Sequence, residues 1–444
     1  MGFTIDELLN GYQKRQFTPV EMINAYLRKC KERDSTLHSY ITLMEKRALE
    51  QAGKYEKVWV NNEKMSLCGI PVSFKDAINI SGVPTTNGSQ IDLTNIAKRN
   101  AEVVDTLETA GCITLGKNNM SEYAADVTSK NKYFGDVFNP LNKKRTAGGS
   151  SSGSAVAVAA DLCIGSIGTD TSGSVRIPAA CCGVVGIKPT VGLVGMKGIM
   201  PLSWTLDHVG VIANNMADVT YLTEALIGVK YRQFDYKNGL IDLKIGLPNA
   251  YFNAFNDNIT DSMMELVINT LEKLGAQIKM IDVSFLNNDT VRLSRTIGTS
   301  EITVIHNDKY NLHKQKYSKE LVQTFERGNN ILAFEYLNAL KTREAWKLKM
   351  DKLLEEVDIM ITPTMPILPP YIEEEQVFNG KEYESIGDYM VKYTSPFNFT
   401  GHPALTLPSG MKKDGLSVGF QMVTSYYREE LLFRVGKVYE QFIK

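Results

Sequence analysis

The 444-residue chain is 43% hydrophobic and 22% charged, values typical of a globular protein with a large core. Its formal net charge of -1 gives no electrostatic reason to expect binding to nucleic acid or to an anionic membrane. No apolar run approaches the roughly 18 residues that a membrane helix needs, and the N-terminus has neither the basic nor the apolar region of a secretory signal.

The cysteines all precede residue 183, mostly within apolar stretches: Cys30, Cys68, Cys112, Cys163, Cys181 and Cys182. In a chain of this size, such a pattern is typical of buried free thiols in a reducing compartment. We therefore expect a cytoplasmic protein.

The first half of the chain predicts helices that alternate with short strands. Thr18 is a candidate helix cap, followed by Pro19 and by Glu21 three residues after the cap. We expect helical structure over 5–54, 101–110 and 153–161, strands over 69–76, 112–115, 163–167 and 183–187, and a loop with short strands over 190–210. Strand-helix-strand order favours an α/β sheet.

The second half is more regular. We expect strands over 243–247, 277–281, 358–362, 405–407 and 418–423, helices over 259–274, 330–356 and 428–442, and a mobile loop over 366–388. The sequence shows no internal repeat. We expect one α/β domain over residues 1–444, in which a helical subdomain could occupy the region near 285–356.

Two clusters of glycine and serine lie between Arg145 and Pro178, around Ser150 and Ser174. The segment between them contains Ala155–Ala160, an apolar run that a flexible linker would not carry. Glycine lets a backbone turn sharply and approach a ligand, and a serine hydroxyl can attack when a base is near. This pattern predicts a binding or catalytic site formed by the two glycine- and serine-rich loops.

Metal and nucleotide sites are not predicted. The histidines are His38, His208, His306, His313 and His402, and none has metal-ligand spacing with another candidate ligand. The segment Gly111–Asn118 resembles a phosphate-binding loop, but Asn118 stands where serine or threonine should hold Mg²⁺, and a helix pattern precedes it. We expect no cofactor and no metal.

The run Gly149–Gly153 matches the G-x-S-x-G nucleophile elbow of α/β-hydrolases, with Ser151 as nucleophile. That motif should follow a buried strand, whereas the residues before it are polar and rich in turn formers. His208 or His402 would complete a histidine-based serine esterase, and Cys182 is an alternative nucleophile. Both alternatives stay open at this point.

Lysine can replace histidine as the base for a serine if burial lowers its pKa. Lys75 ends the apolar strand of 69–76, which makes it the candidate. The alternative is that Lys75 pairs with Asp76 or lies exposed at the strand end.

Over nearly its full length, the chain resembles the amidase signature family of Ser-Ser-Lys hydrolases. The motifs that carry the resemblance, in order, are Ser73–Asp76, Gly148–Ser154, Gly168–Pro178, Gly183–Thr190, Pro201–Gly210, Thr362–Thr364 and Asn398–Pro403. The family usually has Val where Phe74 stands here, and often Gly where Ser172 stands. Several separated motifs in the right order make the match specific.

The resemblance implies an amidase signature fold, a large mixed β-sheet core surrounded by helices. It implies that Ser174 is the nucleophile, Ser150 a bridging serine after a cis peptide bond, and Lys75 the base. The backbone N–H groups of Thr171, Ser172, Gly173 and Ser174 would form the oxyanion hole. Asp170 and Arg176 would hold the turn.

The resemblance also implies hydrolysis of a small-molecule amide to an acid and ammonia or an amine, in a pocket that Ala124 helps to line. Pro201–His208 resembles the free-standing amidases, and the chain is short for the A subunit of a tRNA-dependent glutamyl or aspartyl amidotransferase. We therefore favour the free-standing branch, for which a homodimer is compatible with the sequence. The amidotransferase A subunit is the alternative.

Overall fold

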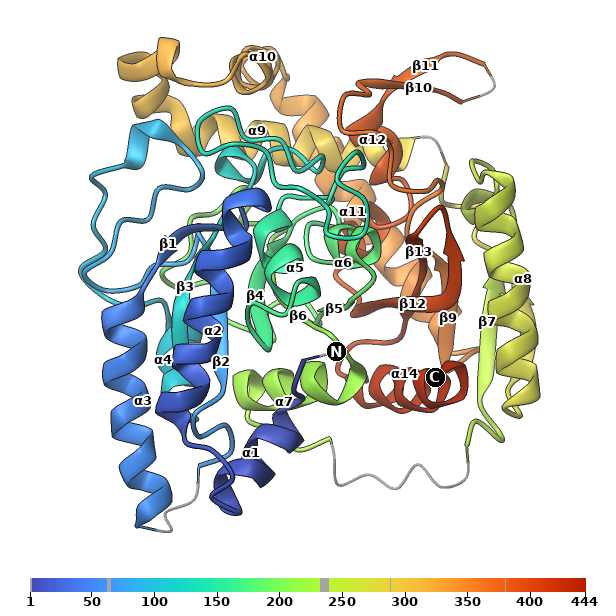
Figure 1. The fold of residues 1–444 in the computed structure, drawn as a ribbon. Helices are drawn as coiled ribbons and strands as arrows, with labels where there is room; N and C mark the ends of the chain where they lie inside the picture. The colour runs from blue at the N-terminus through green and yellow to red at the C-terminus, as the bar shows by residue number, and fades with distance from the viewer. Residues whose placement is uncertain (1, 62–64, 232–238, 288, 380) are drawn as a thin grey trace.

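A mixed β-sheet runs through the molecule (Figure 1). A computed structural model of the chain describes residues 2–61, 65–231, 239–287, 289–379 and 381–444. Within these residues the 11-stranded sheet has the order β1 (Tyr40–Leu43), β3 (Ile113–Asn118), β2 (Pro71–Lys75), β4 (Gly165–Asp170), β6 (His208–Ala213), β5 (Val185–Lys188), β12 (Ala404–Lys413), β13 (Leu416–Val423), β9 (Ile359–Pro363), β7 (Lys244–Pro248) and β8 (Gln277–Ile281). The predicted fold class, α/β with a large mixed sheet among helices, is confirmed.

Strand direction brings the ends of two central strands together. β2 runs parallel to β3 and β4, and β7 runs parallel to β8 and β9, whereas the other paired strands are antiparallel. Because β2 and β4 are parallel neighbours, their carboxyl ends lie at the same edge of the sheet. Lys75 ends β2 and Asp170 ends β4, so these two residues mark one edge.

Helices surround this sheet (Figure 1). They are α1 (Ile5–Gln13), α2 (Pro19–Arg33), α3 (Glu45–Val60), α4 (Glu102–Thr109), α5 (Ser152–Ala159), α6 (Arg176–Cys182), α7 (Met216–Ile227), α8 (Asn258–Lys273), α9 (Asp289–His313), α10 (Lys319–Gly328), α11 (Ala333–Leu354), α12 (Ile386–Met390), α13 (Ser395–Thr400) and α14 (Glu429–Ile443). The predicted cap at Thr18 is confirmed: its hydroxyl accepts from the N–H of Glu21, whose carboxylate accepts from the N–H of Thr18.

Two glycines of β4 let helices approach both faces of the sheet. A Cβ on Gly168 would lie 2.7 Å from the Oγ of Ser151, at the start of α5. A Cβ on Gly165 would lie 2.2 Å from a methyl carbon of Leu222, in α7. Since side chains alternate along a strand, these glycines face opposite sides. α5 therefore packs against the sheet closely enough for its first turn to reach the end of β2.

Several segments differ from the expected elements. Residues 40–43 form β1, a strand within the stretch 5–54 that was expected to be helical. Arg176–Cys182 forms α6, where the sequence pattern predicts no element. The expected mobile loop over 366–388 contains a hairpin of β10 (Gln376–Phe378) with β11 (Tyr383–Ser385) and the start of α12.

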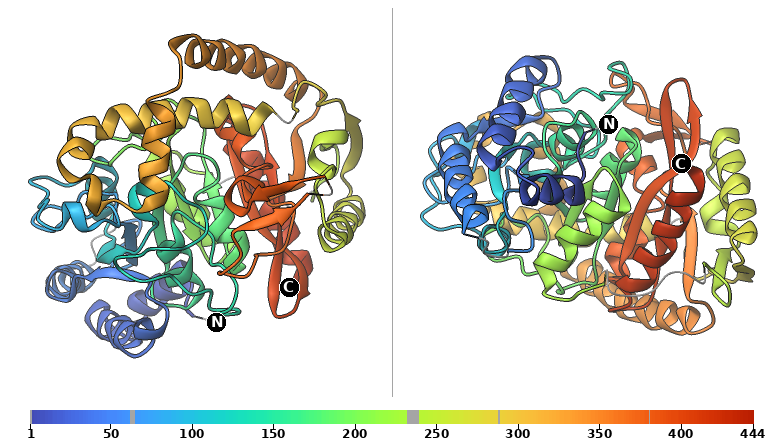
Figure 2. Two further views of the ribbon diagram at one scale, coloured as in Figure 1. Left: turned by 90° about the horizontal axis from the view of Figure 1, so that it is seen from above. Right: turned by 60° about the horizontal axis from the view of Figure 1, so that its bottom comes forward.

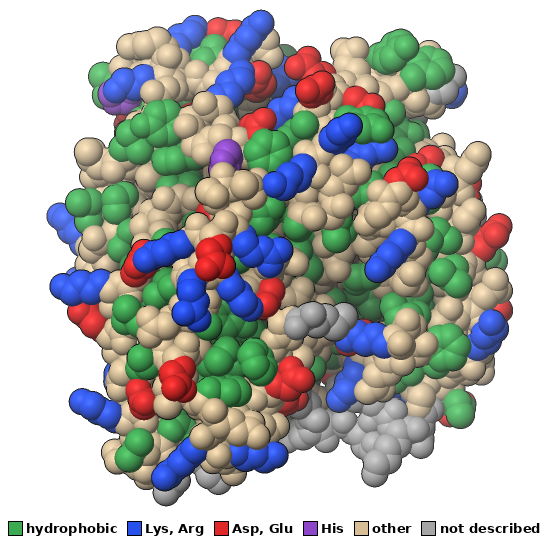
Figure 3. All heavy atoms as spheres, viewed as in Figure 1, with side chains coloured by type: hydrophobic (Ala, Val, Ile, Leu, Met, Phe, Trp, Pro, Cys, Tyr) green, Lys and Arg blue, Asp and Glu red, His purple; other side chains and the backbone are tan. Residues whose placement is uncertain are grey.

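The helices α9, α10 and α11 lie together on one side of the sheet (Figure 2). These helices cover much of the region near 285–356. That the chain forms one domain with a helical subdomain in this region stays a prediction. On the face shown in Figure 3, Lys and Arg side chains are interspersed with Asp and Glu. Among the described residues, no helix is both long and apolar enough to cross a membrane.

Candidate active site

Lys75 and Ser150 are in direct contact at the edge where β2 and β4 end. The Nζ of Lys75 lies 2.7 Å from the Oγ of Ser150 and 2.8 Å from the Oγ1 of Thr169. Lys75 and Ser150 have no exposed surface. Burial lowers the pKa of Lys75 to about 7, although the nearby carboxylates of Asp207 and Asp170 act in the opposite direction. The lysine is therefore able to act as a base near neutral pH.

The two serine loops meet at this edge. The peptide bond between Gly149 and Ser150 is cis, as the family resemblance implies. The N–H of Ser151 donates to the carbonyl oxygen of Ser174 at 3.1 Å, which joins the first loop to the second. Within the described chain, no hydrogen bond joins the hydroxyls of Ser150 and Ser174. Ser174 is 3% exposed and lines a cavity, so its hydroxyl lies where a bound molecule can reach it.

Asp170 and Arg176 form a buried pair that holds the turn between β4 and α6. Arg176 donates to both carboxylate oxygens of Asp170 at 3.0 Å, and Asn398 donates to one of them at 2.8 Å. Burial would raise the pKa of Asp170, but the charge and hydrogen bonds of Arg176 lower that pKa well below its usual range. The structural role predicted for this pair agrees with these contacts.

The backbone N–H groups of the turn fall into two sets. The N–H of Gly173 donates to Asp170 at 2.8 Å. The N–H groups of Thr171, Ser172 and Ser174 have no acceptor among the described residues. The carbonyl oxygen of Ser172 accepts a hydrogen bond from the hydroxyl of Thr394 at 2.5 Å, and this bond holds the peptide group between Ser172 and Gly173 in place. The turn thus presents unpaired donors beside the Ser174 hydroxyl, as an oxyanion site requires.

Asp207 supports the turn through Thr171. The hydroxyl of Thr171 donates to Oδ1 of Asp207 at 2.6 Å, and the N–H groups of Leu202 and Ser203 donate to Oδ2 at 2.8 and 3.0 Å. Burial raises the pKa of Asp207 to about 6, although these hydrogen bonds favour the ionised form. From the sequence, Asp207 was included only within the motif Pro201–Gly210; the structure places it just before β6, which pairs with β4.

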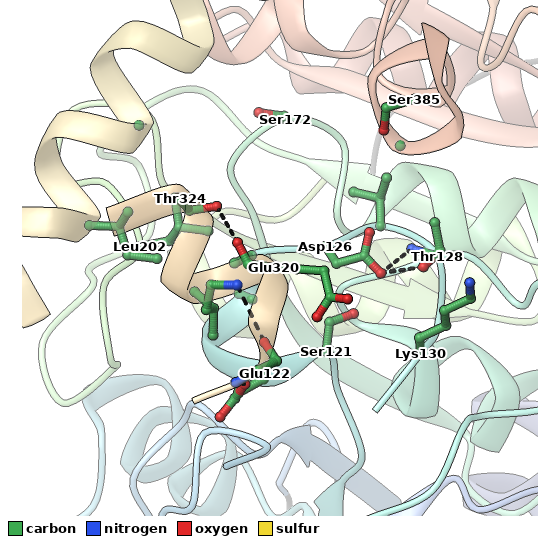
Figure 4. Close-up of a pocket in the computed structure, with 18 of the residues that line it drawn as sticks. Ser121, Glu122, Asp126, Thr128, Lys130, Ser172, Leu202, Glu320, Thr324 and Ser385 are labelled. Carbon is green, nitrogen blue, oxygen red and sulfur yellow. Dashed lines mark hydrogen bonds between the residues drawn. The ribbon is translucent and has the colours of Figure 1, made fainter. Parts of the chain in front are cut away.

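A cavity of about 840 Å³ opens in front of Ser174. Figure 4 shows Ser121, Ser172, Leu202 and Ser385 around it. Ala124, Thr171 and Ser172, which were predicted to contact the substrate, also line it, whereas Ser150 and Gly173, predicted with them, do not. Helices α9 and α10 supply a further part of the wall.

Among the described residues, neither alternative nucleophile has a base in contact with it, and His402, one of the candidate bases, contacts Thr400 and Asp351 instead. The hydroxyl of Ser151 is buried and donates to the carbonyl oxygen of Thr169 at 3.1 Å. His208 binds the carbonyl oxygen of Leu206 at 2.7 Å. The thiol of Cys182 faces the carbonyl oxygen of Ala147 at 3.5 Å, and burial raises its pKa. Neither the esterase nor the cysteine alternative has the required contacts.

Cys30, Cys112, Cys163, Cys181 and Cys182 are buried free thiols, as predicted, and Cys68 is buried as well. Among the described residues, no group of three or more His, Cys, Asp and Glu side chains is arranged to hold a metal ion.

Comparison with known proteins identifies the family. The family model described as Amidase matches residues 21–433. The chain belongs to the amidase family. Together with the site, this membership makes it an enzyme that acts on amide C–N bonds.

Three relatives show the range of this family. The A subunit of the glutamyl-tRNA(Gln) amidotransferase of Clostridium novyi (strain NT) is 32% identical to the chain, over 99% of the chain and 96% of that protein. A solved structure described as a crystal structure of amidase is 28% identical, with a TM-score of 0.93 and full coverage of both chains. The native peptide amidase from Stenotrophomonas maltophilia is 26% identical, with a TM-score of 0.82, over 99% of this chain and 96% of that chain. Amidotransferase A subunits thus stand among the similar relatives, although the sequence motifs favoured the free-standing branch.

Proposed function

We propose that the protein hydrolyses a carboxylic amide to an acid and ammonia or an amine, through an acyl-enzyme on Ser174. The observation that carries this proposal is the contact of the buried Lys75 amine with the Ser150 hydroxyl. A lysine with a pKa near 7 is partly neutral at neutral pH, and a neutral amine can accept the proton of a serine.

The first step transfers one proton and forms one bond. The Ser174 Oγ attacks the amide carbon as its proton passes to the Ser150 Oγ, and Ser150 gives its own proton to Lys75. Catalytic hydrogen bonds are often long before substrate binds, so we expect the hydroxyls of Ser150 and Ser174 to come together in the complex. The N–H groups of Thr171, Ser172 and Ser174 stabilise the oxyanion.

The second step breaks the amide C–N bond. Lys75 returns its proton through Ser150 to the nitrogen, which leaves as ammonia or an amine, and Ser174 keeps the acyl group as an ester. Water then attacks the ester carbonyl, its proton passes along the same path to Lys75, and collapse of the intermediate returns a proton to Ser174. Atoms and charges balance, and Lys75 is again neutral.

Kinetics of single variants test this proposal. We expect Ser174→Ala and Lys75→Ala to lower kcat/KM by at least about a thousandfold on any amide that is turned over. Ser300→Ala is a matched control, because the Ser300 hydroxyl bonds within α9 to Thr296 and does not line the cavity. Full activity in Ser174→Ala would eliminate the assignment.

A second candidate function is the A subunit of a tRNA-dependent glutamyl or aspartyl amidotransferase. Its support is the 32% identity with such a protein over 99% of this chain. In that case the released ammonia would pass to partner subunits instead of to solvent. Copurification of partners and ammonia transfer that depends on charged tRNA would favour this function, whereas simple amide turnover by the isolated chain favours the first.

Two further expectations accompany the leading proposal. The free, buried thiols support a cytoplasmic location, which fractionation of the source cells would test. A homodimer is the assembly we propose for the free-standing enzyme; light scattering of the purified chain separates it from a monomer and from a complex with other subunits.

A further inference from the structure

One face of α9 lines the cavity in front of Ser174 and has no part in the chemistry above. The residues on this face recur at helical spacing: Val291, Ser294, Arg295, Gly298, Thr299 and Ile302. Positions three and four apart lie on the same side of a helix. The face has apolar side chains at its ends. Its middle carries the hydroxyl of Ser294 and the guanidinium of Arg295, and it is open at Gly298.

Gly298 creates the gap. A Cβ built on Gly298 would meet only a methyl carbon of Leu202 within 4 Å, at 3.8 Å, so the glycine leaves open space. Gly298 lies within the long helix α9, where glycine is less favourable than alanine. Space for a bound molecule explains why a glycine is tolerated here.

Ser294 places an unpartnered hydroxyl beside this gap. Its side chain is 3% exposed, and its Oγ has no hydrogen-bond partner among the residues that the structure describes. A buried hydroxyl without a partner destabilises the fold, because it has lost its hydrogen bonds to water. A polar group of the substrate would remove that destabilisation, whereas an apolar acyl chain would not.

Two guanidinium groups line the same cavity as Ser294. Arg295 pairs with Asp388 of α12, and its side chain remains accessible. Arg327 of α10 lines the same cavity; burial first, and repulsion from Arg327 second, lower the pKa of Arg295 to about 10. No carboxylate of the described chain pairs with Arg327, and the nearby Glu320 pairs with Lys132. Of these two guanidinium groups, only that of Arg295 has a carboxylate partner among the described residues.

We propose that the amide substrate carries a carboxylate, which binds between Arg295 and Arg327 and accepts a hydrogen bond from Ser294. This inference rests on the proposed hydrolysis at Ser174 and names the acyl group that the same cavity would hold. The substrate class is the monoamides of dicarboxylic acids, whose carbon chain would pass over Gly298. Guanidinium groups bind carboxylates through paired, charge-assisted hydrogen bonds, which makes them suited to this selection.

The test compares each acid with its neutral ester. Ammonia release would be measured for the monoamides of succinic, glutaric and adipic acids and for their methyl esters. For the monoamide of the preferred chain length, we expect kcat/KM to be at least about tenfold higher for the free acid than for its methyl ester. In Arg295→Gln and Arg327→Gln that preference should fall at least about tenfold, through KM.

Arg292→Gln is the matched control. Arg292 is also on α9, but it is exposed, pairs with Asp289 and does not line the cavity, so this variant should keep the preference of the parent enzyme. Thermal unfolding of each variant verifies that it is folded. Equal kcat/KM for acid and ester, or an unchanged preference in both Arg295→Gln and Arg327→Gln, would overturn the inference.

A binding measurement separates this inference from the proposed function. Calorimetry would measure the affinity of the parent chain, of Ser174→Ala and of the arginine variants for the corresponding products, which are succinate, glutarate and adipate. We expect Ser174→Ala to retain binding and the Arg295 and Arg327 variants to lose at least about tenfold in affinity. Hydrolysis that persists in Ser174→Ala contradicts the proposed function alone; dicarboxylate binding that is absent, or the same in all variants, contradicts the inference alone.

Discussion

The Nζ of Lys75 lies within hydrogen-bond distance of two hydroxyls, at 2.7 Å from Ser150 and 2.8 Å from Thr169, in a site with almost no access to water. Lys75 is 75 residues from Ser150 and 94 from Thr169 along the chain. The contact therefore exists only when β2, β4 and the first turn of α5 are assembled. Folding itself lowers the pKa of the lysine, by removing it from water.

The pH dependence of activity follows from this burial. The pKa of Lys75 is lowered to about 7, and only the neutral amine can accept a proton. We expect kcat/KM to fall as the pH drops through about 7 and to level off above it. Profiles of the parent enzyme and of the Ser300→Ala control should coincide; a profile that is flat from pH 6 to 9 would contradict Lys75 as the base.

Stability should change with pH for the same reason. The pKa of Lys75 is lower in the folded chain than the 10.5 of a free lysine, so between pH 7 and 10.5 the unfolded chain binds more protons. The contribution of Lys75 to the free energy of unfolding therefore rises with pH across this window. Urea unfolding of the parent and of Lys75→Met at pH 7, 8.5 and 10 measures it. A parent-minus-variant difference that does not rise with pH would contradict this expectation.

Protonation of Asp207 provides a second pH effect. Burial raises its pKa to about 6, above the 3.8 of a free aspartate. The folded chain thus binds more protons between pH 3.8 and 6, and the contribution of this carboxyl to stability falls as the pH rises through that window. Asp207→Asn should remove this slope in acid unfolding experiments.

The same variant should also lower activity. The asparagine would keep the size of the side chain but place an amide N–H group where the carboxylate now accepts from Thr171, Leu202 or Ser203. We expect kcat to fall about 10- to 100-fold, because Thr171 holds part of the proposed oxyanion site. Unchanged kcat in a folded Asp207→Asn protein would show that Asp207 does not position the turn.

The sequence predicted the sheet better than the contacts between distant side chains. Regular apolar patterns identified β8 and α11 because periodicity is a local property. β1 was missed because its four residues, Tyr40–Leu43, lie between helices. α6 was missed because Pro178 and the surrounding glycines indicate a turn, although proline fits the first turn of a helix.

Local pattern also cannot supply pairings between distant residues. The family resemblance predicted Lys75 and Ser150, and the structure confirms their contact. The bond of Thr171 to Asp207 spans 36 positions, and the bond of Lys75 to Thr169 spans 94. Such pairs depend on the order of the strands in the sheet, which a single sequence does not encode as a local pattern.

The buried pair of Asp170 and Arg176 should dominate stability at the turn. Asp170→Asn leaves the Arg176 guanidinium buried without its carboxylate, and such losses cost about 3–5 kcal/mol. Asp289→Asn removes the exposed partner of Arg292, which should cost less than about 1 kcal/mol. Denaturant unfolding of both variants measures the contrast; equal costs would contradict the role of the buried pair.

Two glycine-to-alanine variants test the open space along α9. Gly298→Ala should stabilise the fold by about 0.5–1 kcal/mol, since the new Cβ meets no atom closer than 3.8 Å. Gly153→Ala, in α5, would bring a Cβ to 2.3 Å from the carbonyl oxygen of Ser39, and should cost about 1–3 kcal/mol or more. Thermal unfolding measures the stability of both variants. A loss of stability in Gly298→Ala would contradict the claim that the space beside Gly298 is open.

The most direct test of the proposed mechanism is to identify the residue that carries the acyl group. A substrate amide would be mixed with the enzyme, quenched in acid within milliseconds and digested for mass spectrometry of the peptides. We expect an added acyl mass on Ser174 in the parent enzyme, and none in Ser174→Ala or in Lys75→Ala over the same interval. Acylation of Ser151 or Cys182 instead would contradict the mechanism.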